Sequence, residues 1–336
     1  MQLTFLDWAI VLTYLAAALL LAGFFVRRAS RGAEEFFASG RAMPWWLLGT
    51  SMVATTFSTD TPNLVTNIVR TTGVAGNWAW WAFLVTGMMT VFFYARLWRR
   101  CGALTDLELY EIRYSGRPAA MVRGFRALYL GLFFNAVIMA SVTLAAVKIS
   151  SILFGLDRGT TILICGALAV AFSVLSGLWG VVVTDLMLFV FAMVGSISAA
   201  WAVLRLPEVG GLPGLLSQID GARLSLLPDF SNWELTLTVL IIPLAVQWWS
   251  VWYPGAEPGG GSFVAQRILA ARNERHALGA VFWFNFAHYA LRPWPWLIVA
   301  LCSLIVYPEL SDIQAAFPHV APALIGHDIA YPAMLR

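Results

Sequence analysis

Residues 55–62 place hydroxyl groups, one carboxylate and a proline inside an apolar segment of the chain. Pro62 cannot donate a backbone N–H group, and it pushes the residue before it away from helical geometry. The neighbouring hydroxyls can replace backbone hydrogen bonds lost at such a point. In lipid, exposed backbone and a charge such as Asp60 are tolerated only beside protein or a water-filled cavity. The stretch therefore predicts either a proline kink with its hydroxyls bonded back to the backbone, or a broken helix that lines a pathway.

A second interrupted segment, residues 241–271, favours the broken helix. It contains Pro243, two further Pro-Gly runs and Glu257, before an apolar helical pattern resumes near Phe263. The two interruptions fall in the second and seventh expected spans, so these spans cross the membrane in opposite directions. Such a pair, at matching positions of two inverted halves, is typical of the binding site of a secondary transporter. The free ends of the half-helices would offer N–H groups to an anion and carbonyls to a cation.

The elements that must position these residues are membrane-spanning helices. The chain has 336 residues, of which 60% are hydrophobic and 12% charged, and its mean hydropathy is +0.76. This composition is typical of an integral membrane protein. We expect an all-α, polytopic membrane protein whose residues 1–336 form one transmembrane domain. Apolar runs long enough to cross a bilayer are expected near 5–27, 45–70, 77–98, 122–154, 159–177, 180–204, 235–270 and 276–306.

Charge placement predicts the orientation. Asp7 lies near the start of the first apolar run and Arg27, Arg28 and Arg31 follow it, which is the reverse of the charge order in a signal peptide. With the N-terminus outside, fourteen arginines fall in inner segments and five in outer ones. This positive-inside bias predicts a multi-pass protein of the cell (inner) membrane with its N-terminus outside.

Four stretches resemble the sodium:solute symporter family, namely "EEFFASGRAMPWWLLGTSMVATTFS" (34–58), "TDLELYEIRYSG" (105–116), "SGLWGVVVTDLMLFV" (176–190) and "FVAQRILAARNERHAL" (263–278). The resemblance implies an inverted-repeat bundle of the leucine-transporter type with an extra N-terminal helix, 5–27. Residues 45–204 would form the first five-helix repeat, 235–306 the first two helices of an incomplete second repeat, and 307–336 an outer segment. We therefore expect a symporter truncated before its eighth core helix, and unable by itself to concentrate solute.

The same resemblance implies site residues. Backbone carbonyls at the break of the first core helix bind sodium in the family, and the matching positions are Ala54 and Phe57. An acidic residue near the inner ion-exit route matches Asp185. The residues expected to contact solute are Ser58, Thr59, Asp60, Thr61, Trp249, Tyr253, Asn285 and His288.

Two further groups of polar residues leave alternatives open. Asn285, His288 and Arg292 share one helical face, which we expect to face the bundle interior. They could bind solute, or form a structural network in which Arg292 bonds carbonyls freed by prolines 293 and 295. Lys148 is the only lysine, and we expect its ammonium group to extend to the headgroups.

The leading hypothesis is a transporter and not an enzyme: sodium-coupled symport of a sugar, amino acid or carboxylate by alternating access. The expected partners are this solute, Na⁺ and the bilayer, with no nucleic acid, no cofactor and no metal other than Na⁺. The alternatives are a non-functional or accessory fragment of such a transporter, and a channel, which would need a repeated filter sequence. An intramembrane enzyme would need more than His288, since HExxH and GxSxG motifs are absent from the sequence.

Overall fold

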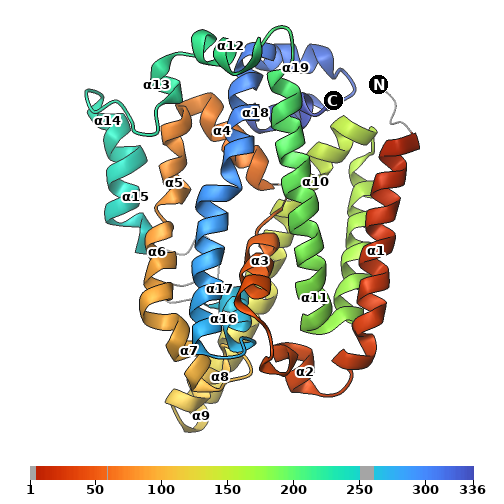
Figure 1. The fold of residues 1–336 in the computed structure, drawn as a ribbon, viewed down its shortest axis with the longest axis vertical. Coiled ribbons are helices and arrows are strands. Elements are labelled where there is room, and N and C mark those ends of the chain that lie inside the picture. The colour runs from red at the N-terminus through yellow and green to blue at the C-terminus, as the bar shows by residue number, and fades with distance from the viewer. Residues whose placement is uncertain (1–4, 59, 250–260) are drawn as a thin grey trace.

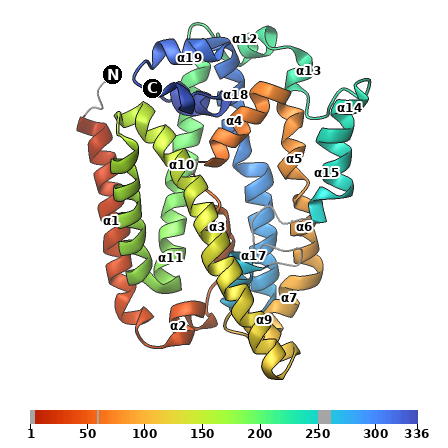
Figure 2. The same ribbon diagram turned by 180° about the vertical axis from the view of Figure 1, so that it is seen from behind.

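The computed structural model describes residues 5–58, 60–249 and 261–336 as a bundle of helices. Its longer helices run roughly along the longest axis of the molecule (Figures 1 and 2). Five helices in the described part are long and apolar enough to cross a membrane. Their bounds are Phe5–Arg28, Val74–Cys101, Gly116–Phe154, Gly177–Leu204 and Glu274–Val306. The prediction of an all-α membrane bundle is confirmed.

The first half of the chain follows the predicted spans closely. α1 (Phe5–Ala29) is joined through α2 (Ala33–Ala38) and η1 (Ser39–Arg41) to the interrupted span. The third and fourth spans are built from consecutive segments. These are η2 (Val74–Asn77), α5 (Trp78–Trp81), α6 (Leu84–Met89), η3 (Thr90–Tyr94) and α7 (Ala95–Cys101), then α8 (Glu108–Arg113), α9 (Gly116–Leu128), η4 (Tyr129–Phe134) and α10 (Asn135–Phe154).

Gly177 separates the fifth and sixth predicted spans within α11 (Arg158–Leu204). Its φ of 54° and ψ of −176° lie in a region that is essentially restricted to glycine. The chain reverses there, so the two parts of α11 run side by side in opposite directions (Figure 1). A glycine at this position explains how two spans can follow each other with almost no loop.

The first predicted break is present. α3 (Trp45–Thr55) ends in the middle of the bundle, and four residues separate it from α4 (Asp60–Thr72). Thr56 follows α3 with φ of −96° and ψ of 7°. Pro62 lies in the first turn of α4, where the N–H group that proline lacks would have no helical partner. The proline therefore lies in the first turn of the second half-helix. The alternative of a kinked continuous helix is wrong.

The second interruption is described only at its flanks. The segments before it are α14 (Trp233–Thr236), η5 (Leu237–Ile241), α15 (Ile242–Ala245) and η6 (Gln247–Trp249). α16 (Ser262–Leu269) follows, with Gly261 as its N-cap. The Pro-Gly runs and Glu257 lie outside the described residues. Bounds of the remaining elements are α12 (Gly211–Gln218), α13 (Gly221–Leu224), α17 (Glu274–Phe286), η7 (Ala287–Leu291), α18 (Pro293–Val306), α19 (Leu310–Ala316), η8 (Pro322–Leu324), η9 (His327–Ile329) and α20 (Ala330–Met334).

α3 lies at the centre of the packing. It contacts α11, α16 and α17, and its residues 47–54 are all buried. Gly49 allows the close approach of α17, because a Cβ there would lie 2.5 Å from the Ala280 carbonyl oxygen. The start of α3 is tied to the end of α16 by backbone hydrogen bonds between Met43 and residues 270 and 272. These contacts bury α3 over most of its length, and the helix ends inside the bundle.

Candidate functional site

The end of α3 exposes backbone carbonyls, because the last turn of a helix has no N–H partners of its own. The Thr56 N–H donates to the Val53 carbonyl at 3.1 Å, and the Phe57 N–H donates to the Ala54 carbonyl at 2.9 Å. Ala54 is buried. The two residues expected to bind sodium through their carbonyls, Ala54 and Phe57, therefore lie on the last turn of α3 and just beyond it.

Arg292, between η7 and α18, caps this helix end. Its Nη1 donates to the Thr56 carbonyl at 2.8 Å, to Thr56 Oγ1 at 2.9 Å and to the Val53 carbonyl at 3.4 Å. A cation is favoured at a helix C-terminus, and the guanidinium also lies over the rings of Phe57 and Trp296. These contacts form a structural network, one of the two alternatives left open for Arg292, but its carbonyls belong to the first broken span and not to residues freed by prolines 293 and 295.

His288 reaches the same helix end from η7. Its Nδ1 lies 3.1 Å from Thr56 Oγ1, and its Nε2 lies 3.4 Å from Arg292 Nη2. η7 is a π-helical turn, a distortion that occurs frequently at functional sites. Trp80 of α5 packs edge-on against the imidazole ring. His288 is thus held beside the break, as the polar face of its span predicts.

Asn285 is fully buried but contacts different groups. Its Nδ2 donates to the Val281 carbonyl at 2.8 Å, and its Oδ1 has no hydrogen-bond partner in the described structure. A Cβ on Gly87 of α6 would lie 1.7 Å from this oxygen. Asn285 therefore faces α6, and the glycine provides the space that it fills.

The start of α4 carries the predicted solute residues of the first break. Ser58 Oγ donates to Asp60 Oδ1, and Thr61 Oγ1 donates to the Thr56 carbonyl at 3.4 Å. A carboxylate at the first residue of a helix interacts favourably with the helix N-terminus. Thr59 and Tyr253 lie outside the described residues, and Trp249 lies in η6 with 57% of its surface exposed. No described contact joins Trp249 to the break.

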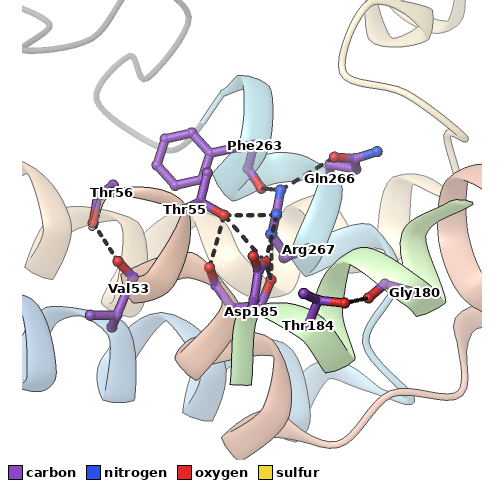
Figure 3. Close-up of polar contacts among 10 residues, drawn as sticks. Val53, Thr55, Thr56, Gly180, Thr184, Asp185, Phe263, Gln266 and Arg267 are labelled. Atoms are coloured by element: carbon purple, nitrogen blue, oxygen red, sulfur yellow. Dashed lines mark hydrogen bonds and ion pairs between the residues drawn. The ribbon is translucent and has the colours of Figure 1, made fainter. Parts of the chain in front are cut away.

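A second polar cluster lies one turn before the break and surrounds Asp185 of α11 (Figure 3). Ser51 Oγ donates to Asp185 Oδ2 at 2.6 Å, and Thr55 Oγ1 lies 3.5 Å from the same oxygen. Arg267 of α16 completes the cluster. Its Nη2 lies 3.3 Å from Asp185 Oδ2 and 2.8 Å from Thr55 Oγ1, and its Nε donates to Ser51 Oγ at 3.0 Å.

Arg267 is one of the fourteen arginines counted in inner segments, and the structure buries it within the bundle. Its side chain is 5% exposed and that of Asp185 is 16% exposed. A buried charge requires a partner, and the acidic residue of α11 provides it. The signal available in the sequence was the position of Arg267 four residues after Phe263, inside an apolar, helix-forming stretch where a loop arginine is not expected.

Known proteins resemble this chain in sequence and in fold. A family model for the sodium:solute symporter family matches residues 36–334. A sodium/glucose cotransporter of Vibrio parahaemolyticus is 23% identical over 347 residues, covering 98% of this chain and 61% of the relative. A sodium/sialic acid symporter of Proteus mirabilis is 26% identical over 188 residues, covering 54% of this chain and 35% of the relative. The chain thus spans less than two thirds of the length of these relatives.

The structure of a Na⁺-coupled sialic acid symporter in a substrate-bound, outward-open state shares the fold, with a TM-score of 0.72 at 19% identity. The similarity covers 98% of this chain and 65% of that one. The predicted bundle of the leucine-transporter type is confirmed. With the family model matching most of its length, the chain belongs to the sodium:solute symporter family.

Proposed function

We propose that the protein acts in sodium-coupled symport of a small organic solute by alternating access, in a cell membrane with its N-terminus outside. The observation that carries this proposal is the end of α3 inside the bundle, where Thr56 turns its carbonyl to Arg292 and its hydroxyl to His288. Interrupted spans of this kind provide the ion and solute sites of secondary transporters. The sodium/glucose and sodium/sialic acid relatives support a sugar or a sugar acid as the solute, and an amino acid stays an alternative on the resemblance alone.

We assign the ion pathway to the oxygens on the last two turns of α3 and to α11. The Ala54 and Phe57 carbonyls lie at the helix end, and the Ser51 and Thr55 hydroxyls face the Asp185 carboxylate. Oxygen ligands of this kind suit a hard cation such as Na⁺. The Arg267 guanidinium binds the same carboxylate and hydroxyls. An entering Na⁺ would therefore compete with it for these oxygens.

We assign the solute to the other side of the break, where Ser58, Asp60 and Thr61 begin α4. His288 and Asn285 would approach it from the opposite span. Trp249, and Thr59 and Tyr253 outside the described residues, remain proposed contacts on the resemblance alone.

The test is uptake by vesicles that contain this chain within a complete symporter, because the chain alone is expected not to concentrate solute. The vesicles carry an inward sodium gradient and are given radiolabelled glucose, proline or sialic acid. We expect Asp60→Asn to abolish sodium-driven uptake of the transported solute while the protein still inserts and remains monodisperse. Asp157→Asn is the matched control, because this carboxylate caps the first turn of α11 on the surface and should leave uptake unchanged. Full uptake by Asp60→Asn would remove Asp60 from the pathway, and uptake without a sodium requirement would refute sodium coupling.

A further inference from the structure

Segment 307–336 follows α18 and folds across one end of the bundle (Figures 1 and 2). Its short helix η9 is attached to two spans at once. His327 of η9 contacts Arg70, in the last turn of α4, and the next residue, Asp328, contacts Lys148 of α10. η9 thus joins the half-helix that follows the break to the fourth span.

Arg70 is the centre of the attachment to α4. It is 3% exposed, and each of its five N–H groups has an acceptor. Nη1 donates to the Ser303 carbonyl at 2.7 Å and to Ser303 Oγ at 3.1 Å. Nη2 donates to the Tyr307 and Pro308 carbonyls at 2.8 and 3.2 Å, and Nε donates to His327 Nδ1 at 3.3 Å. A guanidinium has five donors and no acceptor, so His327 supplies the last partner of a complete set.

This contact requires a neutral imidazole. Because Arg70 only donates, His327 Nδ1 must accept through its lone pair, and the ring proton must lie on Nε2. Protonation of Nδ1 replaces the acceptor by a second donor and places an imidazolium against a buried guanidinium. Arginine does not give up its proton in proteins, so the hydrogen bond between α4 and η9 is lost when His327 is protonated.

The charged groups around the contact come from every neighbouring element. They are Arg70 of α4, Arg223 of α13, Glu309 and Asp312 at the start of α19, Lys148 of α10 and Asp328 of η9. Burial lowers the pKa of His327 and the charge of Arg70 lowers it further, while Glu309 and Asp328 act in the opposite direction. The net shift is downward, so the neutral ring that the contact requires is the form present at neutral pH.

The attachment to α10 does not depend on the imidazole. Lys148 Nζ lies 2.5 Å from Asp328 Oδ2, and the two side chains are 18% and 27% exposed. This ion pair also corrects the expectation that Lys148 extends to the headgroups. Ile329, the last residue of η9, is fully buried in an apolar cluster with Ile152 of α10 and Ile313 of α19. Loss of the contact with α4 therefore leaves η9 joined to α10.

We propose that the contact between Arg70 and His327 is a pH-sensitive latch, which holds η9 on α4 while His327 is neutral and releases it when the ring is protonated. α4 is the half-helix at whose start we place the solute, so the latch links proton binding to the freedom of that half-helix. This consequence rests on the proposed transport function. The latch itself requires neither sodium nor solute.

Hydrogen–deuterium exchange measures the local opening of η9 in the purified 336-residue chain, in detergent micelles without sodium or solute. Peptides from segment 307–336 are compared at pH 7.5 and 5.5, after correction for the pH dependence of the intrinsic exchange rate. Linkage limits the response to about tenfold between these two values, for an open form in which the histidine pKa is ~6.5. We expect exchange there to rise severalfold at pH 5.5, and exchange in α11 to change less than about twofold.

Variants test the assignment to His327. His327→Gln keeps an oxygen that accepts from Arg70 Nε and does not titrate, so the segment should stay protected at both pH values. His327→Leu removes the acceptor, and the segment should open to the same extent at both. His319→Gln is the matched control, because His319 belongs to the same segment but its Nε2 lies 3.1 Å from the Ser151 carbonyl oxygen. The wild-type response to pH should persist in this variant.

Equal exchange of the wild-type segment at the two pH values would overturn the proposal. A pH response that survives in His327→Gln, that disappears in His319→Gln, or that is as large in α11 as in segment 307–336 would also overturn it. Sodium-driven uptake is scored separately in the complete symporter. A pH-dependent opening without uptake refutes only the transport function, and uptake without a pH-dependent opening refutes only the latch.

Discussion

The ion pair between Arg267 and Asp185 gives the sharpest test of how α16 is held against α3. The perturbation is a double-mutant cycle in which Arg267→Met and Asp185→Leu are made singly and together. Both substitutions remove the charge, and methionine also keeps the approximate side-chain volume of Arg267. Each single variant leaves the other charge inside the bundle, whereas the double variant removes both.

The magnitude follows from burial and distance. Arg267 Nη2 and Asp185 Oδ2 lie 3.3 Å apart, and the two side chains are 5% and 16% exposed. At an effective dielectric constant of ~20, two charges at this distance attract by roughly 5 kcal/mol before desolvation is counted. Removing one partner of a buried pair typically costs about 3–5 kcal/mol, while replacing both by apolar groups is often close to neutral. We therefore expect each single variant to lose ~3–5 kcal/mol and the double variant to lose less than either.

The assay is the free energy of unfolding of the purified protein in detergent micelles, measured by titration with a denaturing detergent. The control cycle uses Arg100 and Glu274, whose Nε and Oε1 atoms lie 2.6 Å apart but whose side chains are 62% and 37% exposed. Exposed pairs contribute little to stability, so this cycle should show no measurable coupling. Losses that add within about 0.5 kcal/mol for Arg267 and Asp185, as for independent sites, would refute the reasoning.

Three further outcomes follow from local geometry. Gly49→Ala should cost about 1–3 kcal/mol of unfolding free energy through overpacking, since the added Cβ would meet α17 at 2.5 Å. Gly177→Ala should cost ~1–3 kcal/mol because its φ of 54° and ψ of −176° suit only glycine, and the thermal midpoint measures both variants. Burial, and then the nearby Arg70, lower the pKa of His327. Its stabilising contribution is therefore present above the unfolded pKa of ~6.5 and is lost as pH falls. His327→Gln should make the midpoints at pH 7.5 and 5.5 differ less than in the wild type.

Residues 55–62 predicted either a kink or a break in this span, and the second interruption, at residues 241–271, favoured the break. A hydroxyl-rich stretch followed by proline in an apolar span disfavours a continuous helix. The position of the proline was less predictable, since the same residue can end a helix or occupy its first turn. The structure places Pro62 in the first turn of α4.

The partners of the break could not be predicted, because they depend on long-range packing. Arg292 and Thr56 are 236 residues apart in the chain, and Arg267 and Ser51 are 216 apart. Periodicity showed that Arg292 faces the interior, but it carries no information on which neighbour lies opposite. For Lys148, length and position favoured the headgroups, while the approach of Asp328 depends on the loop that follows α18.

The two arginines that hold α3 differ in what can replace them. Arg292 donates to neutral carbonyls at the end of the helix, where its charge compensates the helix dipole and its packing against Trp296 fixes it in place. Arg267 binds a carboxylate and two hydroxyls, which are the side-chain oxygens of the proposed ion pathway. α16 has only eight residues, and this cluster adds polar contacts with α3 to the backbone hydrogen bonds of Met43. If Na⁺ binds at Asp185 as proposed, it would weaken the contact of Arg267 with this cluster and leave the cap at Thr56 intact.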